Sequence, residues 1–489
     1  MNQIVDFLNG IIWSKALIYL CLGVGVYFSF ATRFLQVRHL KEMVKLLFGG
    51  ETSETGVTSF QAFSIAISGR VGTGNIAGVA TAIALGGPGA LFWMWTIAFL
   101  GAGSAYVESV LGQIYKEEQN GEYRGGPAYY IEKGLGIKWY GITFAVATIL
   151  GVGLFLPGVQ SNSIGAGLEN AFGISPMITG FGLIAVLGLI VFGGVKRIGK
   201  AAEIIVPFMA GAYILVAVVI IFMNISELPK VVTLVFKSAF ALEPAFAGIF
   251  GMAISWGVKR GIYSNEAGQG TGPQAAAAAE VPHPAQQGLV QAFSVYIDTL
   301  FVCSATGFMI LITGMYNVVS PAGGFIVENL SNVDIGPAYT KNAVESMFPG
   351  FGSAFVAVSL LFFAFTTLMA YYYIAETNVA YLIRKFGPSY GWMISGLRVM
   401  LLGATFYGTV KTAGLAWALG DVGVGMMAWL NIIAIIMLRK PAFAALKDYE
   451  KQMANGVEKY TFDPKALGIE NAEFWENRIS KSGDKKKLR

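Results

Sequence analysis

Charged residues are scarce in this 489-residue chain. Asp, Glu, Lys and Arg make up 13% of it and hydrophobic residues 55%, whereas soluble domains carry about 25% charged residues. A chain of this composition needs lipid around it, as its mean hydropathy of +0.60 also indicates. The composition therefore predicts an integral membrane protein, with membrane lipids as its neighbours and no nucleic-acid partner.

Cysteine and histidine are almost missing. Cys21 and Cys303 both lie inside apolar runs, which argues against a disulfide framework and leaves no CxxC metal motif. His39 and His283 lie outside the apolar runs, so a histidine metal centre or proton relay has little material to work with. We expect no resident cofactor.

Catalytic and nucleotide-binding motifs are missing as well. No GxxxxGK[ST] sequence occurs, which argues against a nucleotide-driven pump. The apolar core has no convincing Ser-His-Asp, HExxH or paired-carboxylate arrangement, and Asp298 stands alone there without an evident partner. A membrane enzyme is therefore a weak alternative, and we expect no enzymatic activity.

Long apolar runs are what the chain has instead. A helix needs about 20 residues to cross roughly 30 Å of hydrocarbon, and about eleven runs qualify. The expected spans are 11–32, 58–84, 90–115, 140–163, 175–194, 201–224, 243–268, 285–315, 350–383, 392–411 and 413–438. The predicted fold class is an all-α bundle of transmembrane helices.

Lys and Arg divide unevenly between alternate connections. One set of connections carries fifteen of them, including Lys259 and Arg260, and the other set carries four. Because basic connections stay in the cytoplasm, we expect the N-terminus outside and the C-terminus inside the cell membrane. The tail is expected to be a solvated, partly disordered cytoplasmic extension.

The second expected span is interrupted in its middle by the run Ser68-Gly-Arg-Val-Gly-Thr-Gly-Asn75. Each glycine costs a helix up to about 1 kcal/mol, and irregular backbone at membrane depth is tolerated only where protein or water satisfies its polar groups. An unwound segment would present the amides of Gly72, Thr73, Gly74 and Asn75 at the start of a half-helix, where a carboxylate fits. A glycine-rich packing face is the alternative.

The same interruption would free backbone carbonyls around Ser68 and Val71, which are hard oxygen ligands for an alkali cation. Thr366 and Thr367 in the ninth span add two adjacent hydroxyls. Neutral oxygens with few carboxylates favour a monovalent ion over Ca²⁺ or Mg²⁺, so these four residues are the candidate site for a monovalent cation. Alternatively, the two threonines bond back to their own helix.

The seventh span shows a similar disturbance between Ala253 and Gly270. Interrupted segments in the first and sixth of ten helices indicate an inverted repeat of five plus five helices. A helix that ends at Gly257 and runs into a cytoplasmic loop is the alternative for part of this region. Residues from Lys259 onward are expected near the cytoplasmic mouth, with Asn265 and Glu266 in a structural or gating role.

These features divide the chain into three parts. Residues 1–57 hold an extra N-terminal helix and its basic connection, residues 58–438 the ten-helix core, and residues 439–489 the tail. Within the core, the first repeat covers about 58–224 and the second about 243–438.

Arg70 is the only positive charge in the middle of the first interrupted helix. A guanidinium beside a cation site would repel the ion, and a buried charge needs a partner. We therefore expect Arg70 to point away from the cation and to form an ion pair that serves gating. Its preferred partner is Glu266, and the other candidates are Glu108, Glu203, Asp298 and Glu376.

Three runs resemble the alanine or glycine:cation symporter family, also called the sodium:alanine symporters. They are GRVGTGNIAG at residues 69–78, GGPGALFWMW at residues 86–95 and SNEAG at residues 264–268, and the likeness extends over roughly residues 5–450. The resemblance implies the leucine-transporter (LeuT) fold with one helix ahead of the core. It also implies sodium-coupled symport of a small neutral amino acid by alternating access.

The resemblance further implies roles for particular residues. Backbone around the first break would hold the substrate carboxylate and a sodium ion. Ser255, Trp256 and Gly257 would form the unwound point of the sixth core helix and contact the substrate's amino group and side chain. Gln160, a polar residue after Pro157, is a further expected substrate contact, and the threonine pair would complete the second sodium site.

A channel is the main rival, since a glycine-rich broken helix could also line a selectivity filter. Channels usually repeat such a filter around an axis, whereas these two interruptions differ in sequence. Alanine or glycine is the implied substrate, and glutamine is the alternative. The sodium stoichiometry stays open because no second acidic or hydroxyl cluster is evident, and the sequence leaves the oligomeric state open too.

Overall fold

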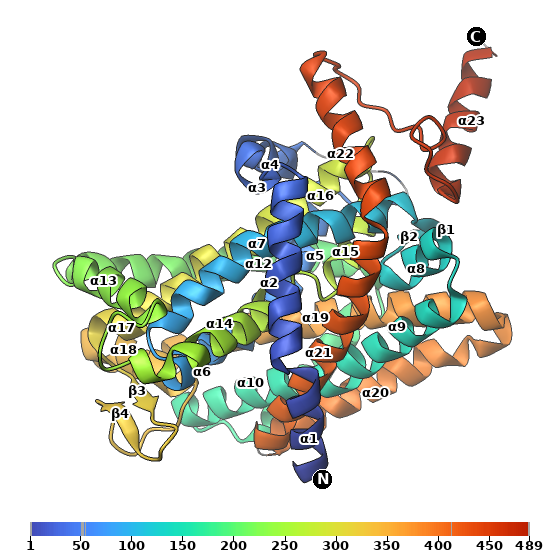
Figure 1. Cartoon of the computed structure of the whole chain (residues 1–489). Helices are drawn as coiled ribbons and strands as arrows, with labels where there is room; N and C mark the ends of the chain where they lie inside the picture. The colour runs from blue at the N-terminus through green and yellow to red at the C-terminus, as the bar shows by residue number, and fades with distance from the viewer. Residues whose placement is uncertain (1, 50–52, 54, 412, 488–489) are drawn as a thin grey trace.

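The computed structural model describes residues 2–49, 53, 55–411 and 413–487. The chain is an assembly of long helices with two short antiparallel hairpins, β1–β2 and β3–β4 (Figure 1). In the described part, eight helices are long and apolar enough to cross a membrane, and Gly74–Gly86 and Pro176–Val191 form shorter apolar helices. The predicted all-α membrane class is confirmed, while the count of eleven crossings stays a prediction.

The elements follow one another in this order. The first half holds α1 (Asn2–Ile12), α2 (Lys15–Ala31), α3 (Leu35–Arg38), α4 (Leu40–Phe48), α5 (Ser59–Arg70), α6 (Val79–Gly86), α7 (Gly89–Ile114), β1 (Glu117–Gln119), β2 (Glu122–Arg124), α8 (Pro127–Leu135), α9 (Lys138–Leu150), α10 (Leu156–Phe172), α11 (Pro176–Val191), α12 (Gly194–Met223) and α13 (Leu228–Ala239). The second half holds α14 (Phe250–Asn265), α15 (Gly272–Ala278), α16 (Pro284–Tyr296), α17 (Ser304–Thr313), β3 (Asn317–Val319), β4 (Phe325–Glu328), α18 (Pro337–Met347), α19 (Gly352–Phe386), α20 (Trp392–Val410), α21 (Ala413–Met437), α22 (Arg439–Ala454) and α23 (Glu473–Lys487).

Large apolar side chains cover the outside of α11 and α12. Phe181, Leu189, Phe208, Leu215 and Phe222 are each more than half exposed. Exposed apolar surface on this scale needs a partner, and for long apolar helices that partner is the lipid. The chain is a multi-pass membrane protein.

The 35-residue helix α19 defines two opposite ends of the bundle. At a rise of 1.5 Å per residue it is about 50 Å long. Its first turn is tied to α18, since the amide of Gly352 donates to Glu345, and its last turn is tied to α8, since Lys385 pairs with Glu132. We name the end with α13, α18 and the β3–β4 hairpin the loop side, and the end with α8, α22, α23 and the β1–β2 hairpin the tail side (Figure 1).

Two interrupted helices run through the core in opposite directions. The α5–α6 helix starts on the tail side and ends on the loop side, where Gly87 lies against Phe246 and Ile249. The α14–α15 helix starts beside Ile249 and ends on the tail side, where Ala279 pairs with Val57. An inverted repeat requires this antiparallel arrangement.

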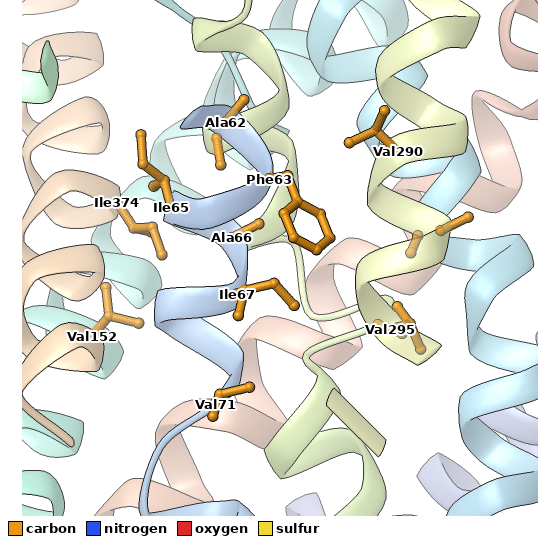
Figure 2. Packing of buried hydrophobic residues seen from close by; sticks show 14 of the residues in the cluster. Ala62, Phe63, Ile65, Ala66, Ile67, Val71, Val152, Val290, Val295 and Ile374 are labelled. Carbon is orange, nitrogen blue, oxygen red and sulfur yellow. The ribbon is translucent and has the colours of Figure 1, made fainter. Parts of the chain in front are cut away.

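The α5 helix is buried on every side. Ile65 and Ile67 are at most 1% exposed, and Figure 2 shows α5 between Ile374 of α19 and Val295 of α16, with the chain leaving helical form after Val71. A helix whose residues from Ala62 to Arg70 are all buried lies in the centre of the bundle. The interruption at its end therefore lies deep in the protein.

The tail corrects one expectation. Much of its described part is exposed, as expected, but it is not disordered, because α22 and α23 form helices on the tail side (Figure 1) and part of the tail is buried against the bundle. Phe462, Ile469 and Trp475 are between 2% and 4% exposed. The prediction failed because these few apolar residues are dispersed among charges, and only the folded core gives them a surface to bury against.

Candidate functional site

The first helix breaks where the sequence predicted. Thr58 and Gln61 form a capping box that starts α5, and the helix ends at Arg70. Val71 then adopts an extended conformation, and the chain resumes as a π-helical turn from Gly74 to Gly78. The break is wholly buried.

Side-chain oxygens satisfy the amides that the break frees. The Gly72 amide donates to Asn75 Oδ1 over 2.9 Å. The Thr73 amide and hydroxyl both donate to Gln160 Oε1, over 3.1 and 2.9 Å. In a continuous helix these two amides would bond the carbonyls of Ser68 and Gly69. At the break, Thr73 thus donates to Gln160 instead of to its own helix. The carbonyls at the end of the preceding half-helix lose their helical hydrogen-bond partners.

The two threonines of α19 face different neighbours. Thr367 Oγ1 lies 3.4 Å from the Val71 carbonyl at the break and donates to the Phe363 carbonyl over 2.9 Å. Thr366 bonds back to its own helix and lies 3.6 Å from the sulfur of Met209 in α12. Adjacent helical residues point about 100° apart, so the structure brings only Thr367 to the break.

The second break does not lie at Ser255, Trp256 and Gly257, and that prediction is wrong. The α14 helix is continuous from Phe250 to Asn265. Gly257 is a packing residue instead, since a Cβ there would lie 2.5 Å from the Cβ of Trp93 in α7. Small residues allow such close contact between membrane helices.

The helix unwinds two turns later, between Asn265 and Gly272. Glu266, Gly268 and Gly270 have φ angles of 56°, 78° and 87°, in the left-handed region that favours glycine. Two amides of this segment are held by one buried carboxylate: those of Gly268 and Gly270 donate to Glu108 of α7 over 3.3 and 3.1 Å. Glu266 therefore stands at the break itself, and its structural or gating role stays a prediction.

Arg70 points away from the break toward α16. It donates to the Gln291 carbonyl over 3.2 Å and to the Ser294 hydroxyl. In the described part of the chain no carboxylate lies within 4.0 Å of its guanidinium, so the expected direct pair with Glu266 is not formed. Glu266 accepts the Thr271 hydroxyl over 2.8 Å instead.

Lys259 and Arg260 also differ from expectation. They lie in the middle of α14 rather than at a cytoplasmic mouth, and both pair with Asp421 of α21, over 2.7 and 3.0 Å. The Arg260 guanidinium lies over the rings of Trp256 and Trp417, 5.3 and 5.2 Å from their centroids. The sequence does not reveal this burial, because the carboxylate that permits it, Asp421, is distant from both residues in the chain.

A cavity of about 910 Å³ leads from the loop side to this arginine. Ala77 and Thr81 of the first broken helix and Asn162 of α10 line it, together with Trp256, Arg260 and Trp417. One turn further along α14, the ring of Tyr263 lies against Gly74. The arginine and two of its aromatic neighbours, Trp256 and Trp417, thus line the cavity beside the first broken helix.

A sequence profile of the sodium:alanine symporter family matches residues 1–464. The chain belongs to this family. A Bacillus subtilis (strain 168) protein, YrbD, is 66% identical over 99% of this chain and all of its own length. The sodium/proton-dependent alanine carrier protein of Bacillus sp. (strain PS3) is 53% identical over 91% of this chain and 99% of its own. The sodium/alanine symporter AgcS of Methanococcus maripaludis is 37% identical, with coverages of 93% and 98%. The family is one of transporters, not enzymes.

A buried polar cluster around Asp298 in the symporter is also one that sequence reasoning missed. Asp298 of the π-helical segment Ile297–Cys303 is fully buried and accepts from Asn75 Nδ2 over 2.6 Å, Ser264 Oγ over 3.0 Å and Thr299 Oγ1 over 2.7 Å. Asn75 therefore joins the first break to Asp298. A carboxylate in the middle of an apolar run was the available signal, but its partners come from other helices.

Proposed function

We propose that this symporter imports a small neutral amino acid, alanine first, together with sodium by alternating access across the cell membrane. The observation that carries the proposal is the buried break at Val71–Thr73. There the Thr73 amide and hydroxyl donate to Gln160, and the Val71 carbonyl lies beside the hydroxyl of Thr367. Such a site suits a zwitterion and a small cation at once. Relatives named for alanine and sodium support the same substrate pair.

The substrate carboxylate would take the place of Gln160 Oε1 on the amide and hydroxyl of Thr73, with the Gly72 amide released from Asn75. The positive end of the half-helix that follows attracts a negative group there. A Cβ added to Gly74 would lie 3.2 Å from the Tyr263 ring. That close packing favours alanine or glycine over glutamine, which remains the runner-up substrate.

The sodium ion would bind the carbonyls of Ser68 and Val71 and the hydroxyl of Thr367. These ligands are neutral oxygens, as a monovalent ion prefers. Thr366 is left out of the site because it faces Met209.

Asp298 would hold a second cation, either a proton or another sodium ion. Asp298 is fully buried and its described hydrogen-bond donors, on Asn75, Ser264 and Thr299, are all neutral, whereas a buried carboxylate needs a counter-charge or a proton. A name that includes both sodium and proton, in the relative from strain PS3, supports a second coupling ion.

The loop side would face outward and the tail side the cytoplasm. Without Lys259 and Arg260, the basic connections still hold thirteen Lys and Arg against four. This bias supports an orientation with the N-terminus outside and α22 and α23 inside.

The test is uptake into liposomes that contain the purified protein. Radiolabelled alanine should accumulate when a sodium gradient is imposed and not when the gradient is replaced by potassium, with saturation at high alanine. Competition by all twenty amino acids should rank alanine and glycine first. A flux that rises linearly with the alanine concentration would favour a channel. Uptake that does not depend on the sodium gradient would contradict the proposal.

A further inference from the structure

The last part of the tail is an anchored element of the tail side. After α22 the chain buries Phe462, Ile469 and Ala472, and then starts α23. The family profile ends at residue 464, so α23 lies beyond the part that the profile describes.

Trp475 is the anchor. It is 2% exposed and is among the largest fully buried side chains of the protein. Its indole nitrogen donates to the Gln113 carbonyl at the end of α7 over 2.9 Å. The rings of Phe462 and Phe474 lie 5.2 and 5.5 Å from it at nearly right angles. Buried aromatic clusters of this kind are held by several contacts at once.

Lys116 lies next to this anchor, is fully buried, and connects the tail with the end of α15. Its Nζ lies 4.2 and 4.6 Å above the rings of Tyr123 and Phe474, and it donates to the Ala279 carbonyl over 2.9 Å. Aromatic faces stabilise a buried ammonium group. The tail thus completes the cage of a lysine that holds the end of α15.

The end of α15 is also the point where the two broken helices meet on the tail side. The Val57 amide donates to the Ala278 carbonyl and the Glu280 amide to the Val57 carbonyl, both over 2.9 Å. Arg478 of α23 pairs with Glu280 over 2.8 Å and donates to the Val281 carbonyl over 3.1 Å. The tail therefore covers the junction between the segment before α5 and the segment after α15.

We propose that residues 462–480 form a latch that holds the tail-side halves of the two broken helices together and so stabilises the state that is open toward the loop side. The inference rests on the proposed transport cycle, in which these halves must separate for release on the tail side. An element that binds one of two states shifts the population toward that state. Release of the latch would be part of every opening on the tail side.

The test is thiol labelling of an Ala278→Cys reporter at the junction, in protein whose Cys21 and Cys303 are alanine and whose transport has been checked. Trp475→Ala and a chain ending at Pro464 should label at least fivefold faster with an impermeant maleimide applied from the tail side. Trp475→Phe should restore most of the protection. Asn477→Ala is the matched control, since that residue is exposed on the same helix.

In the same variants, the external alanine concentration for half-maximal uptake should rise about threefold or more. The reason is that a smaller fraction of the molecules is in the state that is open toward the loop side. Labelling within twofold of the Asn477→Ala control in both variants would overturn the latch. If Trp475→Ala does not fold, Arg478→Ala decides by the same readouts, with a change of at least twofold required. Labelling needs no substrate, so its outcome is independent of whether alanine is the cargo.

Discussion

The glycines that interrupt the two broken helices of this symporter have different structural roles. At the first break Gly72 does not have a positive φ, and what it supplies is space, since a Cβ would lie 2.5 Å from Thr367 Oγ1. At the second break Gly268 and Gly270 supply left-handed backbone. Gly257, in the same helix, supplies only close packing against Trp93.

The difference shows how a glycine in a membrane helix should be interpreted. A glycine that packs against another helix leaves the helix intact, whereas a glycine whose own amide bonds a side chain marks a break. The amides of Gly72 and Gly268 donate to Asn75 and Glu108. The contrast between the two kinds of glycine can be tested directly.

The largest effect is expected from Gly72→Ala compared with Gly257→Ala. The first substitution fills the gap beside Thr367 and Gln160, so sodium-driven alanine uptake should be lost while the folded protein is recovered in normal amount. The second pushes α14 from α7, so thermal stability in detergent should fall while the remaining protein keeps its sodium dependence. The comparison fails if both variants lose uptake at unchanged stability.

The next effect concerns the carboxylate that holds the second break. Glu108→Gln replaces an acceptor of the Gly268 and Gly270 amides and of Asn431 with a group that is half donor. A hydrogen bond to a charged group contributes about 1.5 to 3 kcal/mol, so the uptake rate should fall at least about tenfold. Glu203→Gln, which changes the partly exposed partner of Gln61, is the control and should stay within twofold of the parent protein.

Much of this architecture follows from the sequence because it depends on local pattern. Apolar runs long enough for a bilayer predict the helices, and glycines beside Arg70 and Asn75 predict the first break. The docked tail was not predictable, since Trp475 becomes an anchor only when Gln113 and Lys116 are brought to it.

The site was predictable in the same measure. Thr73, Gln160 and Thr367 meet at the break as expected. Asp298 looked isolated because Asn75 is 223 positions away and Ser264 is 34 away. A cluster built from three helices leaves no spacing in the sequence by which it could be found.

A moderate effect should separate the two threonines of α19. Thr367→Ala removes the hydroxyl beside the Val71 carbonyl, so the sodium concentration for half-maximal uptake should rise about tenfold, as for one lost ligand worth about 1.4 kcal/mol. Thr366→Ala removes a hydroxyl that bonds its own helix, and the same constant should change less than twofold. Equal effects of the two variants would show that the sodium ion lies elsewhere.

The smallest effect is expected from Lys259→Met, which tests whether the middle of the second broken helix depends on both of its cations. Lys259 and Arg260 share Asp421, and the arginine holds it over two nitrogen–oxygen contacts of 3.0 and 3.4 Å. With lysine removed, Asp421 keeps a buried partner, so the alanine concentration for half-maximal uptake should change less than about threefold.

Asp421→Asn is the sharper counterpart, because it leaves two cations in the core without their carboxylate, which is the costly way to break a buried pair. It should reduce uptake far more than Lys259→Met, and Lys259→Met followed by Asp421→Asn should be no worse than Asp421→Asn alone. A lysine variant as damaging as the aspartate variant would mean that Lys259, rather than Arg260, balances the charge beneath the loop-side cavity.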